Sequence, residues 1–189
     1  NNTLQYAWAT SWGRSTRFIG AVIMTHGDDQ GLILPPRLAP IQAVIVPIFK
    51  SEPETAAVME AVQRVQAELK AASVRVKVDN RTEVTPGFKF NDWEMRGVPL
   101  RIEIGPKDIE KGTVALARRD KPGREGKSFV PQAGLAVVVA DLLIDIQKSM
   151  LERATAFRDS HIFNPKDYAE LTEVVQNGWA FSYWCESAE

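Results

Sequence analysis

The feature that most constrains the fold is a nearly continuous apolar run, IQAVIVPIF, at residues 41–49. A short run of this kind is typical of a strand that is buried on both faces of a sheet. The residues after it predict a helix over 53–72, because Ser51 and Glu54 form the S-x-x-E capping pattern and apolar residues then recur at helical spacing. A buried strand followed by an amphipathic helix indicates an α/β domain.

The patterns downstream continue this alternation of strand and helix. The predicted elements are strands at 74–78, 99–105 and 113–119, a helix opened by Thr85 and Pro86 and ended by Gly97, and a long helix from 135 to about 157. The polar residues 120–127 are predicted to form a loop. Right-handed crossovers would place the early strands in parallel. We therefore expect an α/β fold, a mixed β-sheet with helices on both faces.

Shorter patterns flank this domain. Residues 4–12 are rich in aromatics and β-formers and residues 18–24 are apolar, which predicts two strands, or a strand and a helix. Nothing before them completes a core, so we expect a truncated domain at this end. Near the other end, residues 164–165 predict the start of a short helix that ends near Gly178, and residues 179–185 (WAFSYWC) predict a strand.

Charge is distributed unevenly along the chain. The formal net charge is −1, but residues 75–127 hold 13 Lys and Arg against 9 Asp and Glu. A basic middle can present a face that attracts phosphate, although an ordinary mixed surface gives the same count. The single cysteine, Cys185, excludes an intramolecular disulfide. This cysteine usage favours a reducing compartment, so we expect a cytoplasmic protein. No run approaches the roughly 18 apolar residues of a membrane span, so we expect no membrane partner.

Several stretches carry a resemblance to a known family. Residues 10–20 (TSWGRSTRFIG) are similar to motif 3 of class II aminoacyl-tRNA synthetases, and residues 24–32 and 34–40 are similar to the prolyl enzymes in particular. Residues 179–185 are similar to the C-terminal extension of the archaeal/eukaryote-like branch. Over essentially its whole length, the chain resembles the C-terminal part of a prolyl-tRNA synthetase of that type.

This resemblance implies a role for each of three parts of the chain. Residues 1–38 would be a motif 3 remnant of the class II catalytic domain, 39–150 the anticodon-binding domain, and 151–189 a truncated α/β extension of zinc-binding-like type. The parent would be a homodimeric proline-tRNA ligase that charges proline tRNA through prolyl-adenylate, with ATP and Mg²⁺. Motifs 1 and 2 have no counterpart, so we assign no catalytic residue and expect the chain alone to be inactive.

In motif 3, the resemblance implies contacts to ATP and to the amino acid. Arg17 would stack on adenine and reach the γ-phosphate, and Ser15 would hydrogen-bond the nucleotide. Trp12 and Gly13 would line the amino-acid pocket. From spacing alone, a solvated surface arginine is the better explanation of Arg17. His26 lies beside two aspartates, and we expect it to be structural rather than a metal ligand.

The expected tRNA contacts lie mainly in residues 87–108. The resemblance implies two guanines in the proline anticodon. Guanine offers acceptors to arginine or lysine and N–H donors to a carboxylate, and splayed bases stack on aromatic rings. The candidate anticodon residues are Phe90, Trp93, Glu94, Arg101, Asp108 and Lys127. Two alternatives stay open, because Trp93 can belong to the core and Glu94 with Arg101 can form a surface ion pair of little effect.

The resemblance also implies zinc in intact relatives, bound by four cysteines of which Cys185 would be the first. With one cysteine in the sequence, we expect no metal site in this chain. Two other functions fit parts of the sequence. A free-standing accessory module of the same fold would use residues 88–101 for protein–protein contacts. A small nucleotide-binding α/β protein would need a glycine-rich loop after the first strand, which residues 49–53 do not supply.

Overall fold

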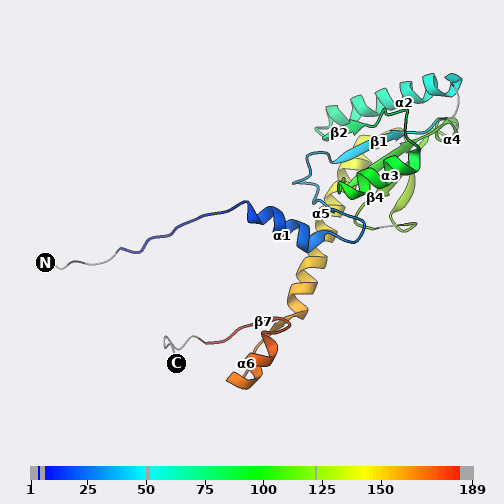
Figure 1. Cartoon of the computed structure of the whole chain (residues 1–189). Coiled ribbons are helices and arrows are strands. Elements are labelled where there is room, and N and C mark those ends of the chain that lie inside the picture. Colours follow the sequence, from blue (N-terminus) through cyan, green and yellow to red (C-terminus); the bar gives the residue numbers. More distant parts are fainter. Residues whose placement is uncertain (1–3, 5–6, 50–51, 122, 184–189) are drawn as a thin grey trace.

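The computed structural model describes residue 4 and residues 7–49, 52–121 and 123–183. A five-stranded sheet with strand order β2-β1-β3-β4-β5 lies at its centre (Figure 1). The strands are β1 (Ala43–Pro47), β2 (Val76–Val78), β3 (Leu100–Ile104), β4 (Thr113–Arg118) and β5 (Lys127–Pro131). β1 runs parallel to β2 and β3, whereas β4 pairs antiparallel with β3 and β5. The sheet is mixed, as the sequence predicts.

Helices cover both faces of the sheet, because the central strand is apolar on both sides. The helices of this domain are α2 (Glu52–Ala71), α3 (Pro86–Met95), α4 (Pro106–Glu110) and α5 (Leu135–Ser160). On one face, Ile45 of β1 shares a large core with Leu69 of α2 and Leu135 of α5. On the opposite face, Val44 of β1 packs with Trp93 of α3. The predicted helix layers are confirmed.

The α3 face of the sheet changes character beyond β1. α3 packs on β1, where both partners are apolar. On the same side of the sheet, β3 presents Arg101 and Glu103. Ala117 of β4 pairs with both Arg101 and Lys127, so Lys127 of β5 lies on this side as well. Phe129, also on this side, is 67% exposed. The sheet beyond α3 therefore turns charged and aromatic groups towards solvent.

Within the sheet domain, two short elements are absent from the sequence prediction. α4 occupies residues that read as a turn, with Pro106 at its first position. β5 begins at Lys127, where a loop was expected to end, and Val130 is the residue of β5 that packs against the large core. Both elements are too short or too polar for periodicity to reveal them.

The N-terminal segment forms a helix rather than a pair of strands. Residues 7–16 adopt neither helix nor strand, and α1 (Arg17–His26) follows them. None of the ten described residues of α1 is buried, although α1 contacts α5. In Figure 1 the chain before α1 extends away from the sheet. Of the two expectations for this segment, the helix is confirmed and the strand over 4–12 is not formed in the described residues.

The C-terminal segment follows α5 at the end that projects from the sheet (Figure 1). β6 (Ile162–Phe163) pairs parallel with β7 (Trp179–Ala180), and α6 (Tyr168–Val174) connects them. The N-cap of α6 is Asp167, whose side chain accepts a hydrogen bond from Glu170 N, rather than the predicted residues 164–165. The strand predicted over 179–185 is shorter, and Cys185 lies outside the described residues. No described helix is long and apolar enough to cross a membrane.

Candidate nucleic-acid interface

The exposed side of the sheet beyond α3 carries a group of five side chains, which we call the open-face cluster. Its members are Phe90, Glu94, Arg101, Glu103 and Lys127. Phe90 and Glu94 lie four residues apart on α3 and share one helix face. Arg101 and Glu103 lie two residues apart on β3 and share one sheet face. Helix and strand periodicity therefore bring the cluster together.

Arg101 lies at the centre of the open-face cluster. Its guanidinium carbon is 4.1 Å from the centroid of the Phe90 ring, a cation–π contact. Arg101 Nη1 donates to Glu94 Oε1 at 2.5 Å, and Arg101 Nε donates to Glu103 Oε1 at 3.1 Å. The guanidinium is thus held between two carboxylates and over an aromatic ring.

Glu103 is the buried member of this cluster. It is 5% exposed, and its second carboxylate oxygen accepts from Lys127 Nζ at 2.7 Å. A buried carboxylate needs cationic partners, and Glu103 has two. The outer groups are more accessible, since the side chains of Glu94 and Lys127 are 34% and 39% exposed. The cluster thus combines a buried, ion-paired carboxylate, Glu103, with the more accessible side chains of Glu94 and Lys127.

A cavity of about 280 Å³ opens on the open-face cluster. Glu94, Arg101 and Lys127 line it. The cavity therefore offers a carboxylate acceptor, a planar guanidinium donor and a lysine ammonium, with an aromatic ring beside them. These are the groups that a guanine edge, a base face and a phosphate require.

Comparisons with known proteins show what this chain is similar to. Residues 42–129 match the anticodon binding domain family. The chain is 60% identical over 189 residues to the proline--tRNA ligase of Roseiflexus castenholzii, and 50% identical over 191 residues to the chloroplastic/mitochondrial proline--tRNA ligase of Arabidopsis thaliana. The chain is a homologue of proline-tRNA ligases. The two alignments cover 100% and 99% of the chain, which spans 39% and 35% of the length of these relatives.

All five residues of the open-face cluster lie within the matched anticodon binding domain. Glu103 was not among the residues that the sequence pointed to. The alternation in L-R-I-E-I places it on the same sheet face as Arg101, and this signal was available. What the sequence does not carry is the burial of Glu103 between two cations.

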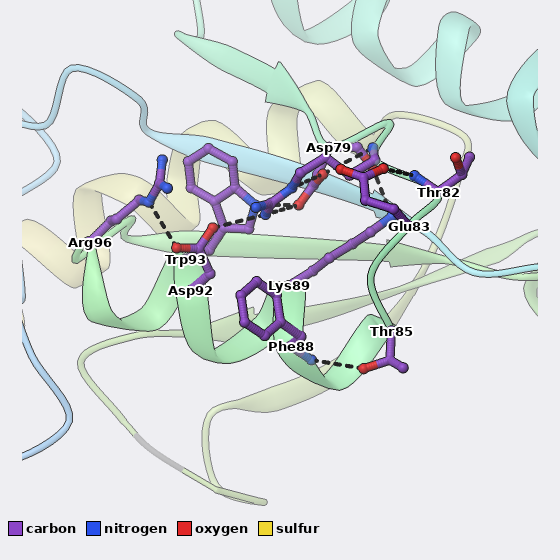
Figure 2. A network of polar contacts seen from close by, with 10 residues as sticks. Asp79, Thr82, Glu83, Thr85, Phe88, Lys89, Asp92, Trp93 and Arg96 are labelled. Atoms are coloured by element: carbon purple, nitrogen blue, oxygen red, sulfur yellow. Dashed lines mark hydrogen bonds and ion pairs between the residues drawn. The ribbon is translucent and has the colours of Figure 1, made fainter.

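Trp93 belongs to a second cluster, on the sheet-facing side of α3 (Figure 2). The residue is 4% exposed, and its indole Nε1 donates to Asp79 Oδ2 at 2.8 Å. Trp93 also packs with Val44 and Val98. A ring in this position cannot stack on a base without leaving the core. We therefore correct the expected tRNA contact of Trp93 to a core position.

Asp79 organises this second cluster, the Asp79 cluster, which also contains Arg81, Asp92 and Trp93. Arg81 donates to both carboxylate oxygens of Asp79 at 2.9 and 2.6 Å, and to Asp92 Oδ2 at 2.8 Å. Burial raises the pKa of Asp79, but the hydrogen bonds from Arg81 and Trp93 outweigh it and lower the pKa to about 2. Lys89 Nζ donates to the Asp79 carbonyl oxygen at 3.3 Å. Asp79 is therefore buried and charged, and both of its carboxylate oxygens accept hydrogen bonds.

Asp108 has a structural contact in α4. Its Oδ2 accepts from Gly105 N at 2.9 Å, which caps the first turn of that helix. The next residue, Ile109, packs against the large core on the face opposite α3. The structure thus places Asp108 at the carboxyl end of β3, away from the described lining of the open-face cavity.

The expected ATP and amino-acid residues do not form a pocket in the described part of the chain. Trp12 is 94% exposed, and Gly13 has open space on the side where a Cβ would lie. The contact within this group is local, from Arg17 N to Ser15 Oγ at 3.3 Å. Arg17 is the first residue of α1, and its side chain is exposed. These residues therefore show no shared geometry for a nucleotide.

His26 is the last residue of α1, the helix that contacts α5. Burial, and then the charge of Arg153, lower its pKa, and its Nδ1 is buried without a hydrogen-bond partner among the described residues. The described part of the chain contains no group of three His, Cys, Asp or Glu that could hold a metal ion. Cys185, which the family resemblance names as the first zinc ligand of intact relatives, lies outside the described residues.

Proposed function

We propose that residues 39–150 bind the anticodon of proline tRNA, within a proline-tRNA ligase that charges this tRNA with ATP. The observation that carries the proposal is the open-face cluster, which lies inside the matched anticodon binding domain. Three of its members, Glu94, Arg101 and Lys127, line a cavity of about 280 Å³. It supplies stacking, guanine-edge and phosphate contacts within one small area.

Four residues of the open-face cluster each have a role in this proposal. The Glu94 carboxylate accepts the N1–H and N2–H₂ donors of a guanine, and the Arg101 guanidinium donates to O6 and N7 of a guanine. Phe90 and the guanidinium plane above it offer a stacking surface for a splayed base. Lys127 neutralises a nearby phosphate.

Guanine is suited to this site because of its complementary edges. Glu94 and Arg101 pair with each other in the free protein, at 2.5 Å. A guanine that separates them offers donors to the carboxylate and acceptors to the guanidinium, so both charges regain a partner. Adenine offers no such pair of edges, since its exocyclic amine replaces the guanine oxygen. The ion pair therefore favours guanine over adenine.

The remaining parts of the chain belong to the same proposal. Residues 1–38 would contribute the motif 3 part of an ATP site, with Ser15 and Arg17 at the nucleotide and Trp12 and Gly13 at proline. Residues 151–189 would begin the C-terminal extension. The parent enzyme would be a cytoplasmic homodimer that uses ATP with Mg²⁺. We derive no step through zinc, because the described residues do not supply its ligands.

Binding of the 189-residue chain to proline tRNA tests the proposal. The comparison is between the unaltered tRNA and the same tRNA with both anticodon guanines replaced by adenine, across a salt series. We expect tighter binding to the unaltered tRNA at every salt concentration. Equal binding that salt abolishes would leave only phosphate attraction, and absence of binding would favour the accessory-module function.

A further inference from the structure

The open-face cavity has one wall that comes from outside the matched domain. Gln30 lines the cavity together with Glu94, Arg101 and Lys127, although the family match begins at residue 42. The Gln30 backbone N–H donates to Asp28 Oδ1 at 2.9 Å. Within the described residues, its side-chain amide has no hydrogen bond. A free donor and a free acceptor thus stand at the wall of the cavity.

Arg119 fixes the turn that carries Gln30. Arg119 is 4% exposed, and its guanidinium donates to both carboxylate oxygens of Asp28 at 2.8 and 2.5 Å. Its Nε donates to the backbone carbonyl of Glu94 at 3.0 Å. The hydrogen bond from Arg119 lowers the pKa of Asp28, because it stabilises the charged carboxylate. One buried guanidinium therefore joins the turn to the residue of α3 that lines the cavity.

Backbone contacts also hold this turn against α3. Leu32 N donates to Met95 O at 3.0 Å, and Leu34 N donates to Gly97 O at 3.1 Å. Gly31 has a φ of 125°, and a Cβ at this position would lie 2.6 Å from Met95 Cα. Only glycine allows this approach without displacement of the helix end. The turn is therefore an integral wall of the cavity rather than a loose linker.

We propose that Gln30 contacts a guanine of the anticodon, and that Asp28 and Arg119 are the positioning residues that hold it at the cavity. The inference rests on the proposed function of the open-face cluster. A primary amide can donate and accept at the same time, so it complements a base edge rather than a phosphate, which only accepts. Gln30 would therefore add to base discrimination and not to general affinity.

The Gln30→Ala chain tests this inference in the same two-tRNA binding assay. We expect its affinity for the unaltered proline tRNA to fall roughly 3- to 10-fold, the effect of one hydrogen bond, and its affinity for the guanine-substituted tRNA to stay unchanged. Gln63→Ala is the matched control, because Gln63 is an exposed glutamine of α2, on the opposite face of the sheet. This control should bind both tRNAs as the unaltered chain does.

The outcomes separate this inference from the proposed function. If the unaltered chain binds both tRNAs equally, the proposed function fails and this inference fails with it. If the unaltered chain discriminates and Gln30→Ala discriminates equally well, the inference alone is overturned. An equal loss on both tRNAs would also overturn it, because that result indicates a backbone contact or a folding defect.

A double-mutant cycle tests the positioning role of Asp28. Asp28→Asn keeps the acceptor for the Gln30 N–H but removes the charge that Arg119 binds. We expect Asp28→Asn to reduce discrimination, and the Asp28→Asn/Gln30→Ala double variant to lose no more than Gln30→Ala alone. Additive losses of discrimination would overturn the positioning role, since Asp28 would then act independently of Gln30.

Discussion

α3 contributes to two charged clusters that contain similar residues in opposite settings. The Asp79 cluster pairs its carboxylate with Arg81 and Trp93 inside the fold, and the Asp79 side chain is 1% exposed. The open-face cluster pairs Arg101 with Glu94 at the edge of a cavity, and the Glu94 side chain is 34% exposed. Both contain a carboxylate–guanidinium pair next to an aromatic ring. Access to a ligand, rather than residue type, distinguishes them.

The two clusters contribute to different free energies, one to that of folding and the other to that of binding. In the Asp79 cluster, the carboxylate has no route to an external partner, so its contacts contribute to the stability of the fold. In the open-face cluster, the same kind of pair can be exchanged for contacts with a base, so it contributes to binding. Substitutions in the two clusters should therefore separate stability from discrimination.

The largest effect is expected in the Asp79 cluster. Asp79→Ala leaves the Trp93 indole N–H unpaired and removes one of the two carboxylates of Arg81. The free energy of unfolding, measured with urea, should fall by about 3 kcal/mol. Asp141→Ala, at an exposed position of α5, is the control and should change it little. Loss of base discrimination in a still folded Asp79→Ala chain would break the separation between the clusters.

The next effect is expected in the open-face cluster. Arg101→Lys keeps the positive charge but loses the planar, bidentate guanidinium. Discrimination between the two tRNAs should fall about 10-fold or more, while the free energy of unfolding stays close to that of the unaltered chain. Arg96→Lys is the matched control, since Arg96 lies at the C-cap of α3 over Trp93, at the other cluster. Similar losses for both variants would contradict a specific role of Arg101.

Acid should weaken the Asp79 cluster in a defined range. The folded pKa of about 2 lies below the ordinary value of 3.8, so Asp79 stabilises the fold above pH 4 and this stabilisation is lost as pH falls towards 2. The expected loss is roughly 2 kcal/mol. Unfolding curves at successive pH values measure it. Asp79→Asn should lack this part of the acid dependence, and an unchanged dependence would contradict the assignment.

The smallest effect is expected at Glu103. Glu103→Gln keeps the shape of the side chain but removes the negative charge between Arg101 and Lys127. Affinity for the guanine-substituted tRNA should rise, the salt dependence should steepen by about one charge, and discrimination should fall a few-fold. Glu60→Gln, on the exposed side of α2, is the control. A uniform loss of affinity would indicate misfolding instead of lost orientation.

The sequence predicts most of the fold because its signals are local. The apolar run of β1, the spacing of valines along α2 and the alternation in β3 each follow from one element's own period. α4 and β5 do not have such a signal. β5 forms because β4 offers it a pairing edge, and that is a tertiary effect.

The sequence predicts those residues of the candidate site whose side-chain directions follow from helix or strand periodicity. Phe90 and Glu94 share a helix face, which places them together. Trp93 is three residues from Phe90, a spacing that fits the same face, and its burial follows from the contacts with Asp79 and Val44. The alternation along β3 places Glu103 beside Arg101, but its burial depends on Lys127 of β5. Gln30 reaches the cavity through the pairing of Asp28 with Arg119, which is distant in sequence.

α5 carries a further consequence for the C-terminal segment. Its 26 residues include five buried ones, and the last of these is Met150. The stretch that follows leads to α6 and β7 (Figure 1). Since each helical residue adds about 1.5 Å and about 100° of rotation, one residue inserted after Met150 would turn the C-terminal segment by more than a quarter of a circle. Seven inserted residues would nearly restore its direction, about 10 Å farther out. The length of α5 therefore sets an angle as well as a distance.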